Sequence, residues 1–157
     1  IAALALGACS NPDRFGTNST VDLNNPGNTT PVEVASNTPG YFTSTIGDRV
    51  LFEVDQSTLS PEGRQIALAQ SNWLLENSSY AVLIEGHADE QGTREYNLAL
   101  SAKRASAVQQ FMISQGVGAS RIRTVPYGKE RPLEICSEES CYAKNRRAVT
   151  VLQAGTS

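Results

Sequence analysis

The chain has 157 residues, a net charge of −3 and one histidine, and this length allows one folded core with additional segments. The net negative charge disfavours nucleic acid as a partner, because binding to a phosphate backbone depends on clustered Lys and Arg. One histidine and three scattered cysteines are too few for a zinc site. We therefore expect no metal, no cofactor and no nucleic acid.

The first residues are apolar or small, from Ile1 to Ala8, and Cys9 follows them directly. A membrane-spanning helix needs about 20 apolar residues, so this stretch is too short to cross a bilayer. It is typical of the end of a secretory signal peptide with its small-residue cleavage site. We expect residues 1–8 to be the C-terminal remnant of such a signal.

A polar segment follows, in which 21 of the 31 residues from Ser10 to Gly40 are Asn, Thr, Ser, Pro or Gly. Such a composition buries too little apolar surface to offset the conformational entropy that folding removes. We expect a flexible, disordered linker over residues 9–44 and a folded domain over residues 45–154.

The first half of this domain shows two strand patterns around a helix pattern. Residues 49–52 are a strand candidate. Ser60, Pro61 and Glu62 are typical of a helix start, and helical spacing continues through Ile66, Gln70, Trp73 and Leu74 to about Asn77. The apolar residues 81–85 are typical of a buried strand.

The second half contains a long helix pattern and two alternating strands. Residues 94–115 place Leu98, Ala102, Ala105 and Met112 on one helical face, which we expect to pack on the core. Residues 121–127 and 147–152 alternate as strands do. Strands and helices that alternate in this order predict a two-layer α/β sandwich.

The densest polar run, residues 85–97, joins the most apolar strand to the longest helix. On that helix Asn97, Ser101, Arg104 and Val108 form one stripe beside the core face. Arg104 near Asp89 would suit a zwitterion, with guanidinium on a carboxylate and Asp on an ammonium. A structural ion pair that ties the loop to the helix is the alternative, and spacing alone leaves both open.

Catalysis is disfavoured, because no nucleophile elbow and no acid–base pair of carboxylates is present. We expect His87 to be a buried, hydrogen-bonded loop residue. Cys136 and Cys141 predict a local disulfide in an exported chain, with two free thiols as the alternative. For the cations of residues 144–147, ligand contact and structural pairing are equally open, and Asn145 is the better contact candidate.

Several ordered motifs together resemble the OmpA-like C-terminal domain and, within that family, its peptidoglycan-associated lipoprotein branch from the Tol-Pal system. The resemblance covers about 105 residues, and its motifs lie in residues 84–93, 95–97, 100–101, 104–108, 116–117, 121–122, 127–132 and 144–149. It implies a βαβαββ-type domain with a mixed four-stranded sheet and two main helices.

The resemblance also implies a ligand and its contacts. The family binds the diaminopimelate residue of the peptidoglycan stem peptide without breaking a bond. Its binding Asp and Arg fall on Asp89 and Arg104, and we expect either to be replaceable by Ala without loss of the fold. The other expected pocket residues are Phe52, Asp55, Asn97, Leu98, Leu100 and Asn145, whereas Glu53 and Gln91 depart from the family pattern.

The N-terminus carries a further resemblance, because residues 6–9 (Leu-Gly-Ala-Cys) are similar to a lipobox. It implies acylation of Cys9 and attachment to the outer membrane of a Gram-negative bacterium, with the domain in the periplasm. TolB and TolA are the implied protein partners. The alternative interpretation is an interaction module that docks chiefly on TolB.

Overall fold

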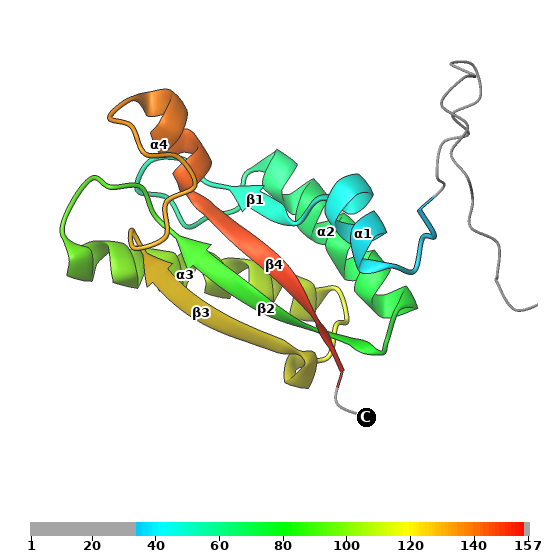
Figure 1. Ribbon diagram of the computed structural model, residues 1–157. Helices are drawn as coiled ribbons and strands as arrows, with labels where there is room; N and C mark the ends of the chain where they lie inside the picture. Colours follow the sequence, from blue (N-terminus) through cyan, green and yellow to red (C-terminus); the bar gives the residue numbers. More distant parts are fainter. Residues whose placement is uncertain (1–33, 156–157) are drawn as a thin grey trace, which may run out of the picture. The chain divides into compact units, whose positions relative to one another are not determined.

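The computed structural model describes residues 34–155, and the expected signal remnant, Cys9 and most of the expected linker lie outside this range. The described elements alternate along the chain (Figure 1). They are α1 (Pro39–Tyr41), η1 (Phe42–Gly47), β1 (Arg49–Leu51), α2 (Pro61–Glu76), β2 (Tyr80–His87), α3 (Arg94–Ser114), η2 (Ala119–Arg121), β3 (Ile122–Gly128), α4 (Glu139–Asn145) and β4 (Arg147–Ala154).

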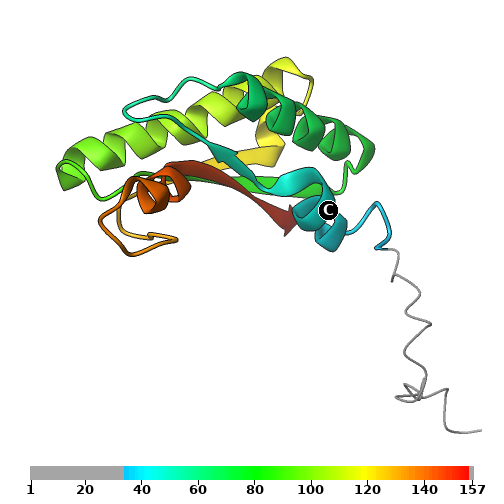
Figure 2. The same cartoon turned by 90° about the horizontal axis from the view of Figure 1, so that it is seen from above.

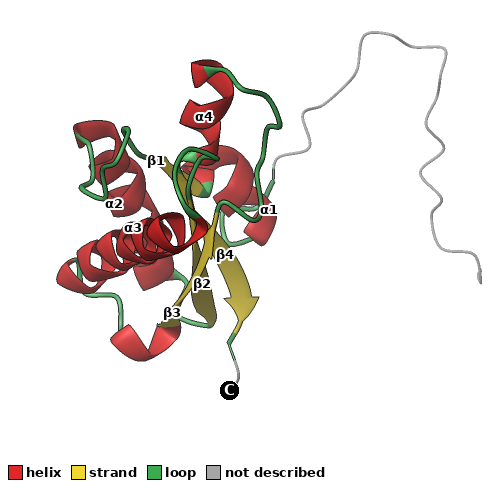
Figure 3. Cartoon of the chain, turned by 90° about the vertical axis from the view of Figure 1, so that its left-hand side faces the viewer, coloured by secondary structure: helices red, strands yellow, loops and turns green. Residues whose placement is uncertain are grey.

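Four strands form one mixed sheet in the order β1-β4-β2-β3. β2 and β3 are parallel, whereas β4 runs antiparallel to both β1 and β2. The two long helices, α2 and α3, lie on the same side of this sheet (Figures 2 and 3). The predicted α/β sandwich with a mixed four-stranded sheet and two main helices is confirmed; the short helix α4, between β3 and β4, was not expected.

The long helices begin where their capping residues predict. Ser60 Oγ accepts a hydrogen bond from the Gly63 N–H at 3.0 Å, and Thr93 Oγ1 accepts one from the Tyr96 N–H at 3.1 Å. Each cap satisfies an N–H that has no partner within its helix. These local bonds explain why both helix starts could be predicted from sequence.

The buried face of α3 differs from the predicted one. Leu98 is 46% exposed and Ala102 is exposed, while the stripe that contains Arg104 turns towards the protein interior. The expected core face was therefore wrong by part of a turn, because it was assigned to apolar residues alone. The residues of α3 that are buried are Asn97, Leu100, Ser101, Arg104, Ala105, Val108 and Met112.

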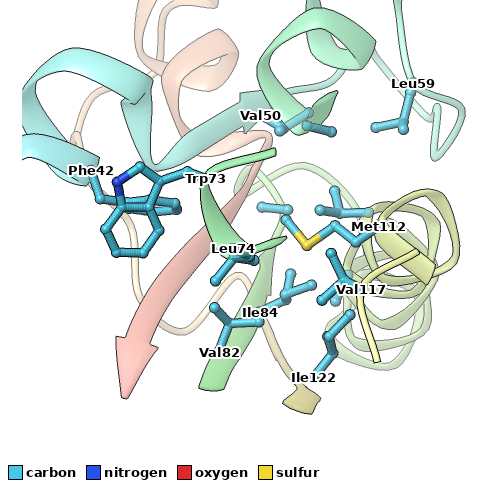
Figure 4. Packing of buried hydrophobic residues seen from close by; sticks show 14 of the residues in the cluster. Phe42, Val50, Leu59, Trp73, Leu74, Val82, Ile84, Met112, Val117 and Ile122 are labelled. Atoms are coloured by element: carbon cyan, nitrogen blue, oxygen red, sulfur yellow. The ribbon is translucent and has the colours of Figure 1, made fainter. Parts of the chain in front are cut away.

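The hydrophobic core fills the layer between the sheet and the two long helices. Figure 4 shows Met112 from α3 close to Ile84 and Val82 from β2, with Leu74 from α2 nearby. Trp73 lies beside Phe42, and their ring centroids are 5.0 Å apart. Among residues 34–155, no helix is both long enough and apolar enough to cross a membrane.

The folded part starts earlier than the expected residue 45. Phe42 is 1% exposed, and the backbone carbonyl of Ser36 accepts a hydrogen bond of 2.7 Å from Trp73 Nε1. Local composition assigned these residues to the polar segment, but the packing of Phe42 on Trp73 and the hydrogen bond to Ser36 attach them to the core. Residues 36–44 therefore pack with the folded part of the chain.

Candidate functional site

Arg104, on the inward face of α3, connects two segments that are distant in sequence. Its side chain is 0% exposed and donates hydrogen bonds to three backbone carbonyls. Nε bonds to Gln56 O at 2.8 Å, Nη1 to His87 O at 3.0 Å and Nη2 to Glu53 O at 3.1 Å. The Phe52 ring lies 5.3 Å from the guanidinium carbon. Arg104 thus fixes the segment after β1 to the end of β2.

Asp89, two residues after β2, is also buried, with 7% of its surface exposed. Its Oδ1 accepts the N–H of Gln91 at 3.1 Å, which shapes the loop that follows the strand. Its Oδ2 lies 3.2 Å from Nη1 of Arg146, and this is the ion pair that Asp89 forms. The structure therefore pairs Asp89 with Arg146 at the start of β4, whereas the sequence pointed to Arg104.

Arg146 is held between two carboxylates. Besides Asp89, it contacts both carboxylate oxygens of Glu139, the first residue of α4, and its Nε donates to Phe52 O at 3.1 Å. Its side chain is 4% exposed, while that of Glu139 is 65% exposed. The run of cations before β4 thus supplies a structural ion pair at Arg146, which was one of the two open interpretations.

The charges of this cluster influence one another. Burial lowers the pKa of Arg104 to about 10, although the negative charge of Asp89 acts in the opposite direction. Burial also disfavours the charge of Arg146, but the hydrogen bonds that it donates to Glu139 and Asp89 outweigh this effect and raise its pKa. Asp89 thus acts on both guanidinium groups, and the cluster combines two cations with two carboxylates.

Two other predicted site residues contact the segments around this cluster, Leu100 is buried on α3, and Leu98 stands apart. Asn97 is buried and donates to Gln91 O at 2.8 Å, and Leu100 is 8% exposed. Asp55 is exposed, has a positive φ of 55° and accepts a hydrogen bond of 3.0 Å from Tyr96 Oη. Leu98 instead lines a cavity of about 210 Å³, whose lining residues include neither Asp89 nor Arg104.

Asn145 supports the loop before α4. Its Oδ1 accepts the N–H groups of Leu133 and Glu134, and its Nδ2 donates to Glu134 O at 2.8 Å. Because both ends of the amide are occupied within the loop, Asn145 positions that loop. This arrangement leaves little capacity for the direct ligand contact that the sequence favoured.

The predicted disulfide between Cys136 and Cys141 is confirmed, with Cα atoms 6.0 Å apart. Ser137, inside the loop that this bond closes, and Tyr142, directly after it, both donate to the carboxylate of Glu90. Glu90 follows Asp89 in the chain. The disulfide loop therefore contacts the segment that carries the candidate site.

His87 is 2% exposed, as expected, but it is the last residue of β2 and does not lie in a loop. Its ring stacks on that of Tyr127, with the ring centroids 5.4 Å apart. The expected hydrogen bond is absent, because neither ring nitrogen has a partner within the described structure. Glu85 lies 3.5 Å from Nε2. Burial lowers the pKa of His87 to about 4, and Arg147 and Arg131 add to this effect.

Sequence reasoning missed Arg146, Glu139 and Tyr96 as members of this cluster. The adjacent cations before β4 were a signal for Arg146, but nothing in the local sequence selects which cation meets Asp89. Glu139 and Tyr96 gave no signal. Among the described residues, no group of His, Cys, Asp or Glu side chains could hold a metal ion.

Comparison with known proteins identifies the family. The family model described as "OmpA family" matches residues 51–146. The chain belongs to the OmpA family. Its relatives include peptidoglycan-associated lipoproteins: the one from Mesorhizobium japonicum is 42% identical over 157 residues, which cover 100% of this chain and 90% of the relative. That from Agrobacterium fabrum is 46% identical over 153 residues, 96% of this chain and 82% of the relative.

Solved structures of other proteins share the fold. The peptidoglycan-associated lipoprotein of Burkholderia pseudomallei superposes with a TM-score of 0.68 at 34% identity, covering 71% of this chain and 96% of that chain. The C-terminal domain of Helicobacter pylori MotB superposes with a TM-score of 0.63 at 18% identity, covering 68% of this chain and 84% of that chain. The second similarity concerns the fold alone. The resemblance inferred from sequence motifs is thus confirmed.

Proposed function

We propose that this chain is an outer-membrane lipoprotein that binds the diaminopimelate residue of peptidoglycan non-covalently and so tethers the membrane to the cell wall. The observation that carries the proposal is the cluster of Asp89, Arg104 and Arg146 where β2 leads into its loop, on the scaffold of a family whose relatives are named peptidoglycan-associated lipoproteins. A zwitterion needs one carboxylate and one cation side by side.

The roles within the cluster follow from charge. Asp89 takes the ammonium of the ligand, because its carboxylate can accept more hydrogen bonds than the two it has. A guanidinium group takes the ligand carboxylate. Arg104 retains N–H donors beyond its three backbone contacts. No step breaks a bond, and the cluster supplies binding only.

Access to Arg104 requires movement, because its side chain is fully covered. The segment of residues 53–56 provides two of the carbonyls that it contacts. This segment is tied to α3 by the exposed hydrogen bond between Asp55 and Tyr96. Opening of this bond would let a ligand carboxylate reach the guanidinium group.

Co-sedimentation with purified sacculi tests the proposal. Asp89→Asn keeps the shape of the side chain and removes its charge, so binding should be lost while the fold remains. Glu95→Gln is the matched control, because Glu95 is exposed in the first turn of α3. If folded Asp89→Asn protein sediments with sacculi as fully as the parent does, the assignment of Asp89 is wrong.

The anchor and the membrane location belong to the same proposal. Cys9 carries the acyl chains, and several chains together give firm attachment because each buried methylene contributes about 0.8 kcal/mol. Cys9→Ser protein should be released from outer-membrane vesicles by salt washing, whereas the parent should remain bound.

Docking on a Tol-system protein, chiefly TolB with TolA as a further partner, is the second candidate function. Exposed apolar side chains next to the site favour it: Leu133 is 44% exposed and Ile135 is 87% exposed in the loop that Asn145 supports. Replacing Ile135 by Ser should weaken a TolB pull-down and leave binding to sacculi unchanged. Loss of both would indicate one shared face.

A further inference from the structure

The guanidinium group of Arg146 is shared between Glu139 and Asp89. The guanidinium group of Arg146 donates to both carboxylate oxygens of Glu139, and Nη1 also reaches Asp89 Oδ2 at 3.2 Å. Bidentate contact is the strongest arrangement of a guanidinium with a carboxylate. In this structure Glu139 has that arrangement, and Asp89 has a single contact.

This division of contacts affects the charge that a ligand would meet. One cation shared between two carboxylates compensates only part of their combined negative charge. Without Glu139, Arg146 would be free to turn both of its terminal nitrogens to Asp89. Asp89 would then be paired more completely, and an incoming ammonium group would have to compete with a buried guanidinium.

The disulfide loop holds Glu139 in place. Glu139 lies between Cys136 and Cys141 in the chain, and the pair closes a loop with a sequence separation of five residues. Ser137 and Tyr142, on either side of Glu139, donate to Glu90 at 3.2 and 3.0 Å. An exposed carboxylate is thus restrained from both sides, which lowers the entropy lost when it holds Arg146.

We propose that Glu139 is a positioning residue for ammonium recognition: presented by the disulfide loop, it holds Arg146 away from full pairing with Asp89 and so keeps Asp89 able to bind the ligand. The inference rests on the proposed function, because it concerns the same site. The hydrogen bond with Arg146 also lowers the pKa of Glu139, which keeps it ionised.

Titration calorimetry of the full chain with two peptides tests this role. The first is a stem tripeptide that ends in meso-diaminopimelate, and the second is the same peptide with its distal ammonium acetylated. Glu139→Gln should raise the Kd for the first peptide about twofold to fivefold, the scale of one charge interaction near a protein surface. The Kd for the acetylated peptide should stay the same, so the preference for ammonium should fall.

Glu138→Gln is the matched control, since it removes the same charge one residue earlier from an exposed side chain in the same loop. It should leave both Kd values unchanged. A general structural defect would weaken both peptides equally and would overturn the proposal. Equal effects of Glu138→Gln and Glu139→Gln would overturn it as well.

A double variant, Cys136→Ser with Cys141→Ser, tests the restraint. It should lower the preference for ammonium as Glu139→Gln does. An unchanged preference would show that the disulfide does not act through Glu139.

Asp89→Asn separates this inference from the proposed function. If it abolishes binding while Glu139→Gln has no effect, this inference fails and the proposed function stands. If Asp89→Asn binds like the parent, the proposed function itself fails.

Discussion

Gly86 of β2 lies directly against the backbone of Ser101 in α3, so that a Cβ added at Gly86 would come within 1.9 Å of the Ser101 carbonyl oxygen. The same Ser101 accepts the Gly128 N–H through its Oγ at 2.9 Å. This close approach of helix and strand places Arg104, one turn later on α3, within reach of the His87 carbonyl. The geometry of the site therefore depends on a residue with no side chain.

Gly86→Ala should destabilise the domain strongly, because the obstructing atom is backbone and cannot move aside alone. We expect a loss of about 3 kcal/mol or more in the free energy of unfolding. Urea denaturation measures it. Gly118→Ala is the control, since the nearest atom to its added Cβ is a side-chain carbon of Arg121 at 3.9 Å, and its stability should change little.

Arg104→Met should lower stability as well as binding, contrary to the expectation from sequence that the fold survives loss of this residue. The substitution leaves one buried and two partly buried carbonyls without their donor, and we expect a cost of about 3 kcal/mol. Thermal denaturation measures the loss of stability in Arg104→Met. Lys103→Met is the control, because it removes an exposed charge one residue earlier and no bonded side chain, so any effect of charge alone appears in both variants. Equal melting temperatures would contradict the role of Arg104 in the fold.

His87 should make stability dependent on pH in mildly acidic solution. Its pKa is about 4 in the folded chain and 6.5 in the unfolded chain, so the unfolded state takes up the proton first. The contribution of neutral His87 is therefore complete above pH 6.5 and is lost as the pH falls towards 4. The loss approaches about 1.4 kcal/mol per pH unit and about 3 kcal/mol in total.

Denaturation at pH 7.5 and at pH 5 measures this effect, with His87→Phe as the control that keeps a ring on Tyr127. The control should lose the slope between pH 6.5 and 5. Because the chain has one histidine, the imidazole signal in an NMR titration belongs to His87 without further assignment. A titration midpoint near 6.5 in the folded protein would contradict the prediction.

Phe42→Ala should show that the residues before β1 belong to the folded domain. Phe42 is 1% exposed and packs on Trp73, and the loss of a buried Phe costs about 3 to 5 kcal/mol. The chain has one Trp, so its fluorescence reports unfolding at this contact. Thr43→Ala, an exposed neighbour, is the control. Equal stability of the two variants would place Phe42 outside the core.

Local patterns in the sequence were sufficient for the two long helices and the four strands of the fold. Helix caps such as Ser60, apolar spacing and strand alternation depend on bonds between residues close in the chain, so they can be read without the tertiary structure. The ordered motifs were sufficient for the family. The same local signals misplaced the inward face of α3, because they gave no reason to count Arg104 as buried.

Which side chains pair with one another inside the site depended on the tertiary structure alone. Asp89 and Arg146 are 57 residues apart, and they meet because β4 lies beside β2 in the sheet. Spacing along a helix could bring Arg104 to the loop of Asp89, but it could not show that three backbone carbonyls occupy its guanidinium group. Sequence alone thus brought Asp89 and Arg104 to the end of β2, and the packing of distant segments decided that Arg146 and Glu139 join them and which of these charges pair.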